Sequence, residues 1–240
     1  NVVGLEFPRN LKVTDERVVN LINGAYSAAQ GVFEARLLPM NKLDKERKKA
    51  LIERHLISLA LANNTQNGAV IVEGDKKFGI SVMLNEEDHI RLQVIENGFC
   101  LDEAYDLADK LDTLLDEQLN FAFNEKLGYL TQCHTNLGTG MRASVMLHLP
   151  ALKKSGAMNM LANNLNKLGL TIRGAHGEGS SSEGAIYQLS NQVSLGISEK
   201  SAIENLNNDE VWFSHPADFD DTMDSVLNND IESEIKEFER

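Results

Sequence analysis

Two short apolar runs separated by only five polar residues restrict this chain to a narrow set of folds. Residues 69–72 and 78–84 have the composition of strands, and Glu73–Lys77 between them has the residue types of a hairpin turn. A third run, His89–Ile95, follows after a short acidic segment. Strands joined this closely must pair antiparallel, because a parallel pair needs a crossover of a dozen or more residues. The order of elements therefore predicts an α+β fold, an antiparallel β-sheet flanked by helices.

Apolar residues spaced three and four apart predict helices around these strands. Four helices are predicted. The first starts at Thr14, the second spans residues 43–62, the third starts at Asp102, and the fourth runs from residue 158 to Gly169, where it ends. In the second of them, Leu51, Ile52, Leu56 and Leu59 are predicted to face inward. Further extended segments are predicted at residues 129–132, 144–149, 170–173 and 186–190.

Three consecutive acids, Glu86, Glu87 and Asp88, follow the second strand of the hairpin, and Arg91 comes three residues later. In an extended segment the side chains of Glu87, His89 and Arg91 point to one face of the sheet. On such a face, the acid could bind a cation and the arginine an anion in the same cleft. A solvated turn is the alternative interpretation of the acids.

A second candidate region is the glycine-rich segment Gly128–Val145, which contains Cys133 and Arg142. Glycine lets backbone N–H groups approach an anion, because it has no Cβ. A reactive thiolate at Cys133 would need positive charge nearby; a small buried hydrophobic residue is the alternative. Downstream, Arg173 ends a predicted strand and Glu178 lies in a glycine-flanked turn. A structural ion pair and a solvent-exposed acid are the alternatives for Arg142 and Glu178.

The composition excludes several classes of function. The 240 residues carry a formal net charge of −13, which argues against non-specific binding to nucleic acid or to an anionic membrane. Two cysteines, Cys100 and Cys133, make a disulfide framework improbable and favour a reducing, cytoplasmic compartment. No apolar run reaches the roughly 18 residues of a membrane span. Zinc-ligand spacing, a Walker A loop and a nucleophile elbow are absent from the sequence.

Four segments of the chain together resemble the phosphagen (guanidino) kinase family, in particular its bacterial protein-arginine kinase branch. They are Asn85–Arg91, Gly128–Pro150, Arg173–Gly179 and Gly184–Gln192. The resemblance extends from residue 1 to residue 206 and implies a guanidino kinase catalytic domain with the glutamine-synthetase-like fold. Residues 207–240 are then an acidic tail of unknown role. The family uses ATP, with Mg²⁺ held mainly by the nucleotide phosphates and water, so no protein metal ligands are expected.

The resemblance also implies roles for individual residues. Glu87 and Glu178 resemble the two carboxylates that hold the acceptor guanidinium, and Cys133 resembles the cysteine near the acceptor nitrogens. The chemistry agrees, because a guanidinium has a pKa above about 12 and needs a proton acceptor before a nitrogen can attack. The residues expected at the nucleotide are His55, Arg91, Arg142, Ala143, Ser144, Val145, Met146, Arg173, Gly174, Ala175, His176, Gly177 and Glu178.

Two features favour the protein-directed branch. Gly140 occupies a position where small-guanidine kinases usually have serine or threonine, and the chain has no room for their N-terminal helical domain. The expected function is ATP-dependent phosphorylation of exposed arginine residues in proteins. The branch links this activity to bacterial stress response and protein quality control, through an activator protein and an AAA+ protease system, and a homodimer is an expected assembly.

Three departures from the family keep alternatives open. A Ser–Ser–Arg–x–Arg phosphate-binding segment would precede Asn1, His134 replaces a proline after the cysteine, and the resemblance ends after Leu206. The first alternative is a truncated or degenerate relative that binds nucleotide or arginine without turnover. The second is a kinase for free arginine.

Overall fold

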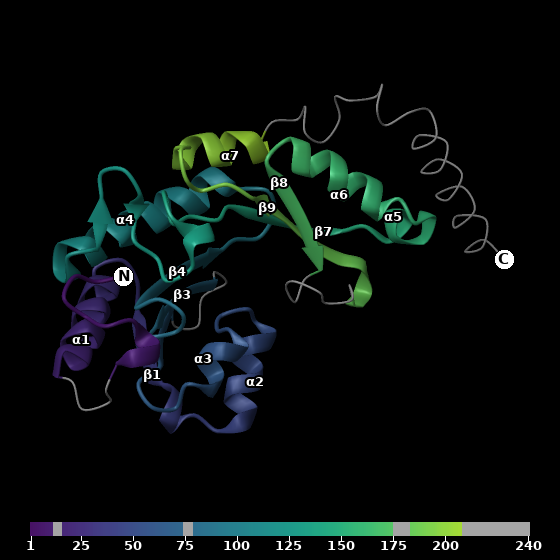
Figure 1. Ribbon diagram of the computed structural model, residues 1–240. Coiled ribbons are helices and arrows are strands. Elements are labelled where there is room, and N and C mark those ends of the chain that lie inside the picture. The colour runs from purple at the N-terminus through teal and green to yellow at the C-terminus, as the bar shows by residue number, and fades with distance from the viewer. Residues whose placement is uncertain (12–15, 74–78, 175–182, 208–240) are drawn as a thin grey trace. The chain divides into compact units, whose positions relative to one another are not determined.

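The computed structural model describes residues 1–11, 16–73, 79–174 and 183–207. These residues form two compact units, one from Asn1 to Gly140 and one from Met141 onward, and each is described by itself. In Figure 1 the first unit carries α1 to α4 and the second carries α5 to α7. None of the helices in the described ranges has the length and apolarity needed to traverse a bilayer.

A four-stranded antiparallel sheet organises the first unit, with strand order β1-β2-β3-β4. Its strands are β1 (Ala35–Pro39), β2 (Ala69–Glu73), β3 (Gly79–Leu84) and β4 (Ile90–Ile95). Ile71 lies opposite Val82, which confirms the predicted antiparallel pairing of the two apolar runs. The α+β prediction is therefore confirmed, with the detail that the described strands form three separate sheets.

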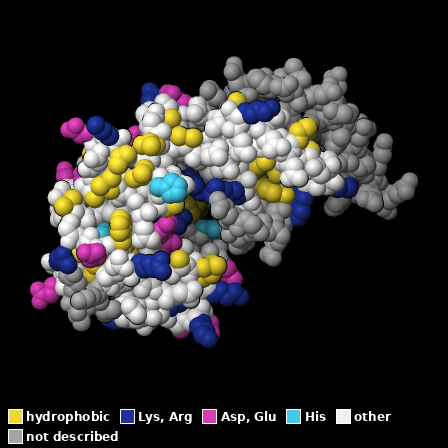
Figure 2. Space-filling view, viewed as in Figure 1, with side chains coloured by type: hydrophobic (Ala, Val, Ile, Leu, Met, Phe, Trp, Pro, Cys, Tyr) yellow, Lys and Arg dark blue, Asp and Glu magenta, His cyan; other side chains and the backbone are white. Residues whose placement is uncertain are grey.

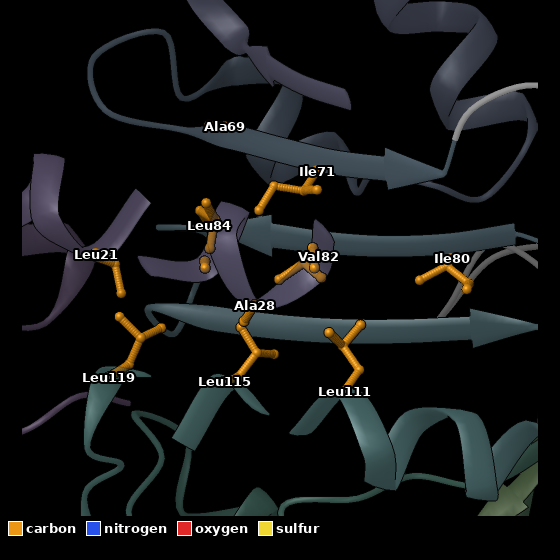
Figure 3. Packing of buried hydrophobic residues seen from close by; sticks show 12 residues of the cluster. Leu21, Ala28, Ala69, Ile71, Ile80, Val82, Leu84, Leu111, Leu115 and Leu119 are labelled. Carbon is orange, nitrogen blue, oxygen red and sulfur yellow. The ribbon is translucent and has the colours of Figure 1, made fainter. Parts of the chain in front are cut away.

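Two long helices cover one face of this sheet, α1 (Glu16–Gln30) and α4 (Leu101–Leu119). Figure 3 shows their leucines directed at the alternate residues of β2 and β3. Leu111 and Leu115 are completely buried, and burial of each contributes about 2 kcal/mol to folding. Gly24 lets α1 approach α4 closely, because a Cβ at this position would lie 2.6 Å from a methyl carbon of Leu119.

The other face is covered by two shorter helices, α2 (Lys45–Glu53) and α3 (Leu59–Asn63), and by the 3₁₀ turn η2 (Met40–Lys42). The prediction of one helix over residues 43–62 is wrong. His55 adopts a left-handed conformation, with φ of +57°, which ends α2. Ser58 then caps a new helix by accepting a 3.0 Å hydrogen bond from the Leu61 N–H.

This break also changes which residues of the segment are buried. Leu51 and Leu56 are buried, as predicted, and Ile52 is half-buried. Leu59 was predicted to face inward but is 68% exposed, because it opens the new helix instead of continuing the phase of α2.

The last part of the first unit is mostly irregular. It holds the small hairpin of β5 (Phe123–Asn124) and β6 (Gly128–Tyr129) and the 3₁₀ turn η3 (His134–Asn136). Of the predicted extended segment 129–132, only Tyr129 belongs to a strand, and the Leu130 N–H donates to the Ala122 carbonyl at 2.8 Å. A further 3₁₀ turn, η1 (Pro8–Asn10), follows the N-terminus.

The second unit is built on a three-stranded antiparallel sheet with strand order β7-β9-β8. Its elements are β7 (Ser144–His148), α5 (Pro150–Ser155), α6 (Met158–Lys167), β8 (Leu170–Gly174), η4 (Glu183–Ala185), β9 (Ile186–Asn191) and α7 (Glu199–Asn207). Gly169 has a φ of +75° and ends the helical region before β8, as predicted. The sequence reasoning missed α5, which Pro150 starts at its first position.

Candidate active site

The three consecutive acids lie in a tight turn between β3 and β4. Asn85 is fully buried with a φ of +57°, and its N–H donates to the His89 carbonyl at 3.0 Å. The Glu86 N–H donates to the Asp88 carbonyl at 3.1 Å. The prediction that Glu87, His89 and Arg91 share one face is therefore wrong. Because the turn replaces an extended segment, Glu87 is exposed whereas His89 is only 1% exposed.

Glu86 is used to fix this turn. Its side chain is 7% exposed, and one carboxylate oxygen accepts from the Ser58 hydroxyl at 2.5 Å and lies 3.4 Å from Nη1 of Arg91. The other oxygen accepts from the Glu87 N–H at 3.0 Å. Glu86 thus anchors Arg91 and the backbone of Glu87, and the turn presents the carboxylate of Glu87 to solvent.

The surroundings of Glu87 alter its acidity. Partial burial raises the pKa of its carboxyl, the negative charges of Asp88 and Glu86 raise it further, and Arg91 opposes them. A carboxylate with a raised pKa is a stronger proton acceptor, which is the property that a general base needs.

Asp88 joins the acidic turn to the segment of Cys133. One of its oxygens accepts from the Gln132 N–H at 2.7 Å and also from the side-chain amide of Asn1. The same Asn1 amide donates to the Leu130 carbonyl at 2.9 Å. The structure therefore holds the backbone next to Cys133 against the turn that carries Glu87, a role for Asp88 that the sequence reasoning missed.

Cys133 is half-buried in a network of short polar contacts. Its sulfur lies 3.0 Å from the hydroxyl of Thr135, and the Thr131 hydroxyl donates to the Cys133 carbonyl at 2.7 Å. The hydroxyl of Thr135 thus gives the thiol a polar contact, which is compatible with a role beyond packing.

The loop after Cys133 is closed by backbone bonds at Gly138. The Tyr129 N–H donates to the Gly138 carbonyl at 2.9 Å, and the Gly138 N–H donates to the Leu127 carbonyl at 2.8 Å. Gly128 permits this approach, because a Cβ there would lie 2.2 Å from the Gly138 oxygen. The glycines therefore serve backbone packing at this point.

Replacing His134 by proline is expected to leave the fold intact and to raise the free energy of unfolding by about 0.4–1 kcal/mol. His134 is the first residue of η3, a position that proline tolerates. Cys133 before it has φ −89° and ψ 122°, the extended conformation that a residue preceding proline requires. Urea unfolding of the two proteins measures the change. A loss of stability would show that the imidazole makes a contact that the loop needs.

His55 and Arg91 belong to the same side of the first unit. The Gln93 side chain donates to the His55 carbonyl, and Gln93 and Arg91 are two residues apart on β4, so they share a face. The structure brings these two predicted nucleotide residues into one region, together with Glu87.

In the second unit, Asn191 holds the backbone on both sides of Arg142. Its side-chain oxygen accepts from the Ala143 N–H at 2.8 Å, and its amide nitrogen donates to the Met141 carbonyl at 3.3 Å. Asn191 is only 5% exposed, so water has little access to compete for these two hydrogen bonds. Sequence reasoning gave Asn191 no role, although a polar residue at the end of an apolar strand is a usable signal.

The central strand β9 aligns the other predicted nucleotide residues of this unit. Gln188 lies opposite Met146 on one side and opposite Arg173 on the other, so these three side chains share a face of the sheet. The Gln188 amide donates to the Ser144 hydroxyl on the same face at 2.8 Å. Val145 alternates to the opposite face. Gly174 ends β8 opposite Tyr187, and the predicted residues Ala175, His176, Gly177 and Glu178 lie outside the described residues.

The described site thus combines an exposed carboxylate of raised pKa, a neighbouring arginine and a cysteine loop in an α+β fold. Residues 17–209 match the family described as ATP:guanido phosphotransferase, C-terminal catalytic domain, and the chain belongs to this family.

Among curated relatives, the protein-arginine kinase of Clostridium kluyveri is 47% identical over 210 residues, covering 86% of this chain and 60% of the relative. The protein-arginine kinase of Caldanaerobacter subterraneus is 43% identical over 209 residues, covering 86% and 61%. The chain thus spans about three fifths of the length of these relatives.

Solved structures give the same fold. The duplicated taurocyamine kinase from Schistosoma mansoni, determined with bound transition state analog components, superimposes with a TM-score of 0.72 at 29% identity, covering 86% of this chain and 30% of that one. Lombricine kinase superimposes with a TM-score of 0.69 at 24% identity, covering 86% and 60%, and supports the fold alone.

Proposed function

We propose that this chain carries the catalytic part of a kinase that transfers the γ-phosphoryl group of ATP to the guanidinium of arginine residues in proteins. Membership of the ATP:guanido phosphotransferase family supports the reaction, and the two protein-arginine kinases support the substrate class. The observation that carries the proposal is the turn at Glu87, where Glu86 and Asp88 hold the backbone and leave one carboxylate of raised pKa exposed.

Glu87 orients the arginine guanidinium and accepts its proton as the new N–P bond forms and the bond between the γ-phosphorus and the ADP oxygen breaks. Glu178 is the proposed second carboxylate on the guanidinium. Arg91, Arg142 and Arg173 offset the negative charge on the transferring group, and Cys133 lies near the acceptor nitrogens. The thiol contact with Thr135 and the Asp88 link to Gln132 support this place for Cys133.

In the proposed reaction, Mg²⁺ binds together with ATP as the Mg-ATP complex. Glu86, the acid nearest to Glu87 in the chain, is already engaged by Ser58, Arg91 and the Glu87 backbone. This arrangement fits an ion held by phosphates and water, which Mg²⁺ prefers to a full protein cage.

The remaining assignments are parts of the same proposal. We place the catalytic domain at residues 1–206, and the family match over residues 17–209 supports this extent. The protein works in the cytoplasm on proteins with exposed arginines, in a stress-response pathway with an activator protein and an AAA+ protease, and a homodimer is the proposed assembly. Of these assignments, the names of the two protein-arginine kinase relatives support the substrate class.

The direct test is transfer of label from γ-labelled Mg-ATP to an arginine-rich protein. The expected product is acid-labile and base-stable phosphate on the protein, with much less transfer to free arginine. Equal transfer to free arginine would favour the small-guanidine alternative. Binding of ATP without any transfer would favour the degenerate relative.

The rate of transfer is expected to rise with pH through the titration of Glu87. Protonated Glu87 cannot accept a proton, and its raised pKa places the acid limb of the profile at a higher pH than that of an ordinary glutamate. The substrate guanidinium stays protonated throughout this range. Initial rates at constant ionic strength measure the profile. A profile that is flat from about pH 4.5 to about pH 8 would exclude Glu87 as the base.

A further inference from the structure

A polar cleft of about 200 Å³ lies in the first unit, beside the acidic turn. Residues from four places in the sequence line it: residues 8–11 near the N-terminus, residues 64–67 before β2, Glu86 and Gln132. Its volume is several times the roughly 30 Å³ that one water molecule occupies in the liquid. The cleft can therefore admit a chemical group larger than solvent.

The wall at residues 64–67 is fixed by asparagine side chains. The Asn64 amide donates to the Asn67 side-chain oxygen at 2.8 Å and to the Asn85 carbonyl at 2.8 Å. The Asn85 amide in turn donates to the Asn67 carbonyl at 3.0 Å. Since Asn85 is fully buried and precedes the acids, this network ties the cleft wall rigidly to the turn of Glu87.

Three exposed side chains complete the lining, Arg9, Gln66 and Gln132. Among the described residues, the Gln66 and Gln132 side chains form no hydrogen bond; only their backbone N–H groups are engaged, with Asn64 and Asp88. A side-chain amide offers a donor and an acceptor at once, which matches the donor and acceptor of a peptide group. Arg9 adds a cation that suits a carbonyl oxygen or an acidic side chain.

The cleft adjoins the residues assigned to the acceptor guanidinium. Glu86 precedes Glu87 and binds its N–H, and Gln132 precedes Cys133 and is held by Asp88. A polypeptide whose arginine reaches Glu87 would therefore place its neighbouring peptide groups near this lining.

On the proposed function, on which this inference rests, we propose that the cleft binds the main chain of the substrate polypeptide next to the target arginine. Gln66 and Gln132 pair with peptide groups, and Arg9 favours a carbonyl or an acidic residue close to the arginine. The cleft thus supplies affinity for protein substrates that a free guanidine cannot use. Among the described residues that line the cleft, Arg9 is the one cation, and side-chain amides make up much of the rest. This lining suits a peptide better than a polyphosphate, because a polyphosphate calls for several cations.

The test is calorimetric binding of a capped peptide with one central arginine to the protein and to the double variant Arg9→Ala, Gln66→Ala. Removal of two hydrogen-bonding side chains is expected to weaken peptide binding about tenfold. The affinities for Mg-ADP, by calorimetry, and for agmatine, by NMR titration, should stay within about twofold. Gln118→Ala, an exposed glutamine on α4, is the matched control and should leave the peptide affinity unchanged.

The outcomes separate the two proposals. An unchanged peptide affinity in the double variant would overturn the cleft assignment, as would equal weakening of agmatine or of Mg-ADP. Replacing the arginine of the peptide by citrulline tests the proposed function, because a working acceptor site must prefer the guanidinium. Binding that is unchanged by this replacement yet still depends on Arg9 and Gln66 would show that the cleft binds peptide main chain, but would overturn the kinase assignment and with it the target arginine. No binding of the peptide to the parent protein would overturn both.

Discussion

Replacing Glu87 by glutamine is expected to lower the rate of phosphoryl transfer by about 10²–10⁴, because the amide can neither accept the proton nor balance the guanidinium charge. The affinity for Mg-ATP should remain, since Glu87 is assigned to the acceptor. Single-turnover transfer of labelled phosphate and calorimetric titration with nucleotide measure the two properties. Loss of nucleotide binding in this variant would contradict the assignment.

The same substitution should not destabilise the fold. Folding raises the pKa of Glu87, so its proton binds more tightly in the folded protein. The associated stability is present at pH values below the unfolded pKa and is lost as pH rises through the folded pKa. At neutral pH a neutral glutamine therefore has no electrostatic cost, and Tm should be unchanged or higher. Glu117→Gln, an exposed acid on α4, is the control that should keep full activity.

Replacing Gly128 by alanine is expected to reduce the free energy of unfolding by about 3 kcal/mol and to depress transfer. The new Cβ would lie 2.2 Å from the Gly138 oxygen and 2.6 Å from its Cα, so the backbone must separate. Separation costs the two hydrogen bonds of Gly138, at about 1 kcal/mol each. The φ of +71° adds about 1–2 kcal/mol for any residue with a Cβ. Urea unfolding measures the loss.

Gly98→Ala separates the two causes. Gly98 also has a positive φ, of +89°, but a Cβ there would meet nothing within 4 Å. Its replacement should therefore cost only the conformational part, about 1–2 kcal/mol, and leave transfer intact. Equal losses at the two positions would show that the contact between Gly128 and Gly138 does not hold the cysteine loop.

Periodicity was a good guide where a helix or strand packs on one core. Apolar spacing predicted the buried faces of α1 and α4 and the pairing of β2 with β3, because each of these elements buries one face. Periodicity failed between α2 and α3, where the left-handed His55 and the cap at Ser58 interrupt an apolar pattern that is itself continuous. A single backbone conformation of this kind leaves no trace in the spacing of apolar residues.

The candidate site shows the same division. The sequence predicted Glu87, Arg91 and Cys133 as a group, through their motifs and the family resemblance. The structure places both the Glu87 N–H and the Arg91 guanidinium in contact with the carboxylate of Glu86. The expected shared face of Glu87, His89 and Arg91 was wrong, because the turn at Asn85 uses hydrogen bonds that an extended strand would have directed elsewhere.

By itself the sequence determined the α+β class, the family and the inventory of acids, arginines and thiol, because these depend on residue type and local order. Only the tertiary structure decided which acid is exposed and which are internal partners. Ser58 and Arg91 contact the carboxylate of Glu86, and Gln132 and Asn1 donate hydrogen bonds to Asp88. Glu87 remains exposed. The physical reason is that these contacts join residues up to 87 positions apart. Adjacent carboxylates with identical chemistry acquire different roles only from such distant neighbours.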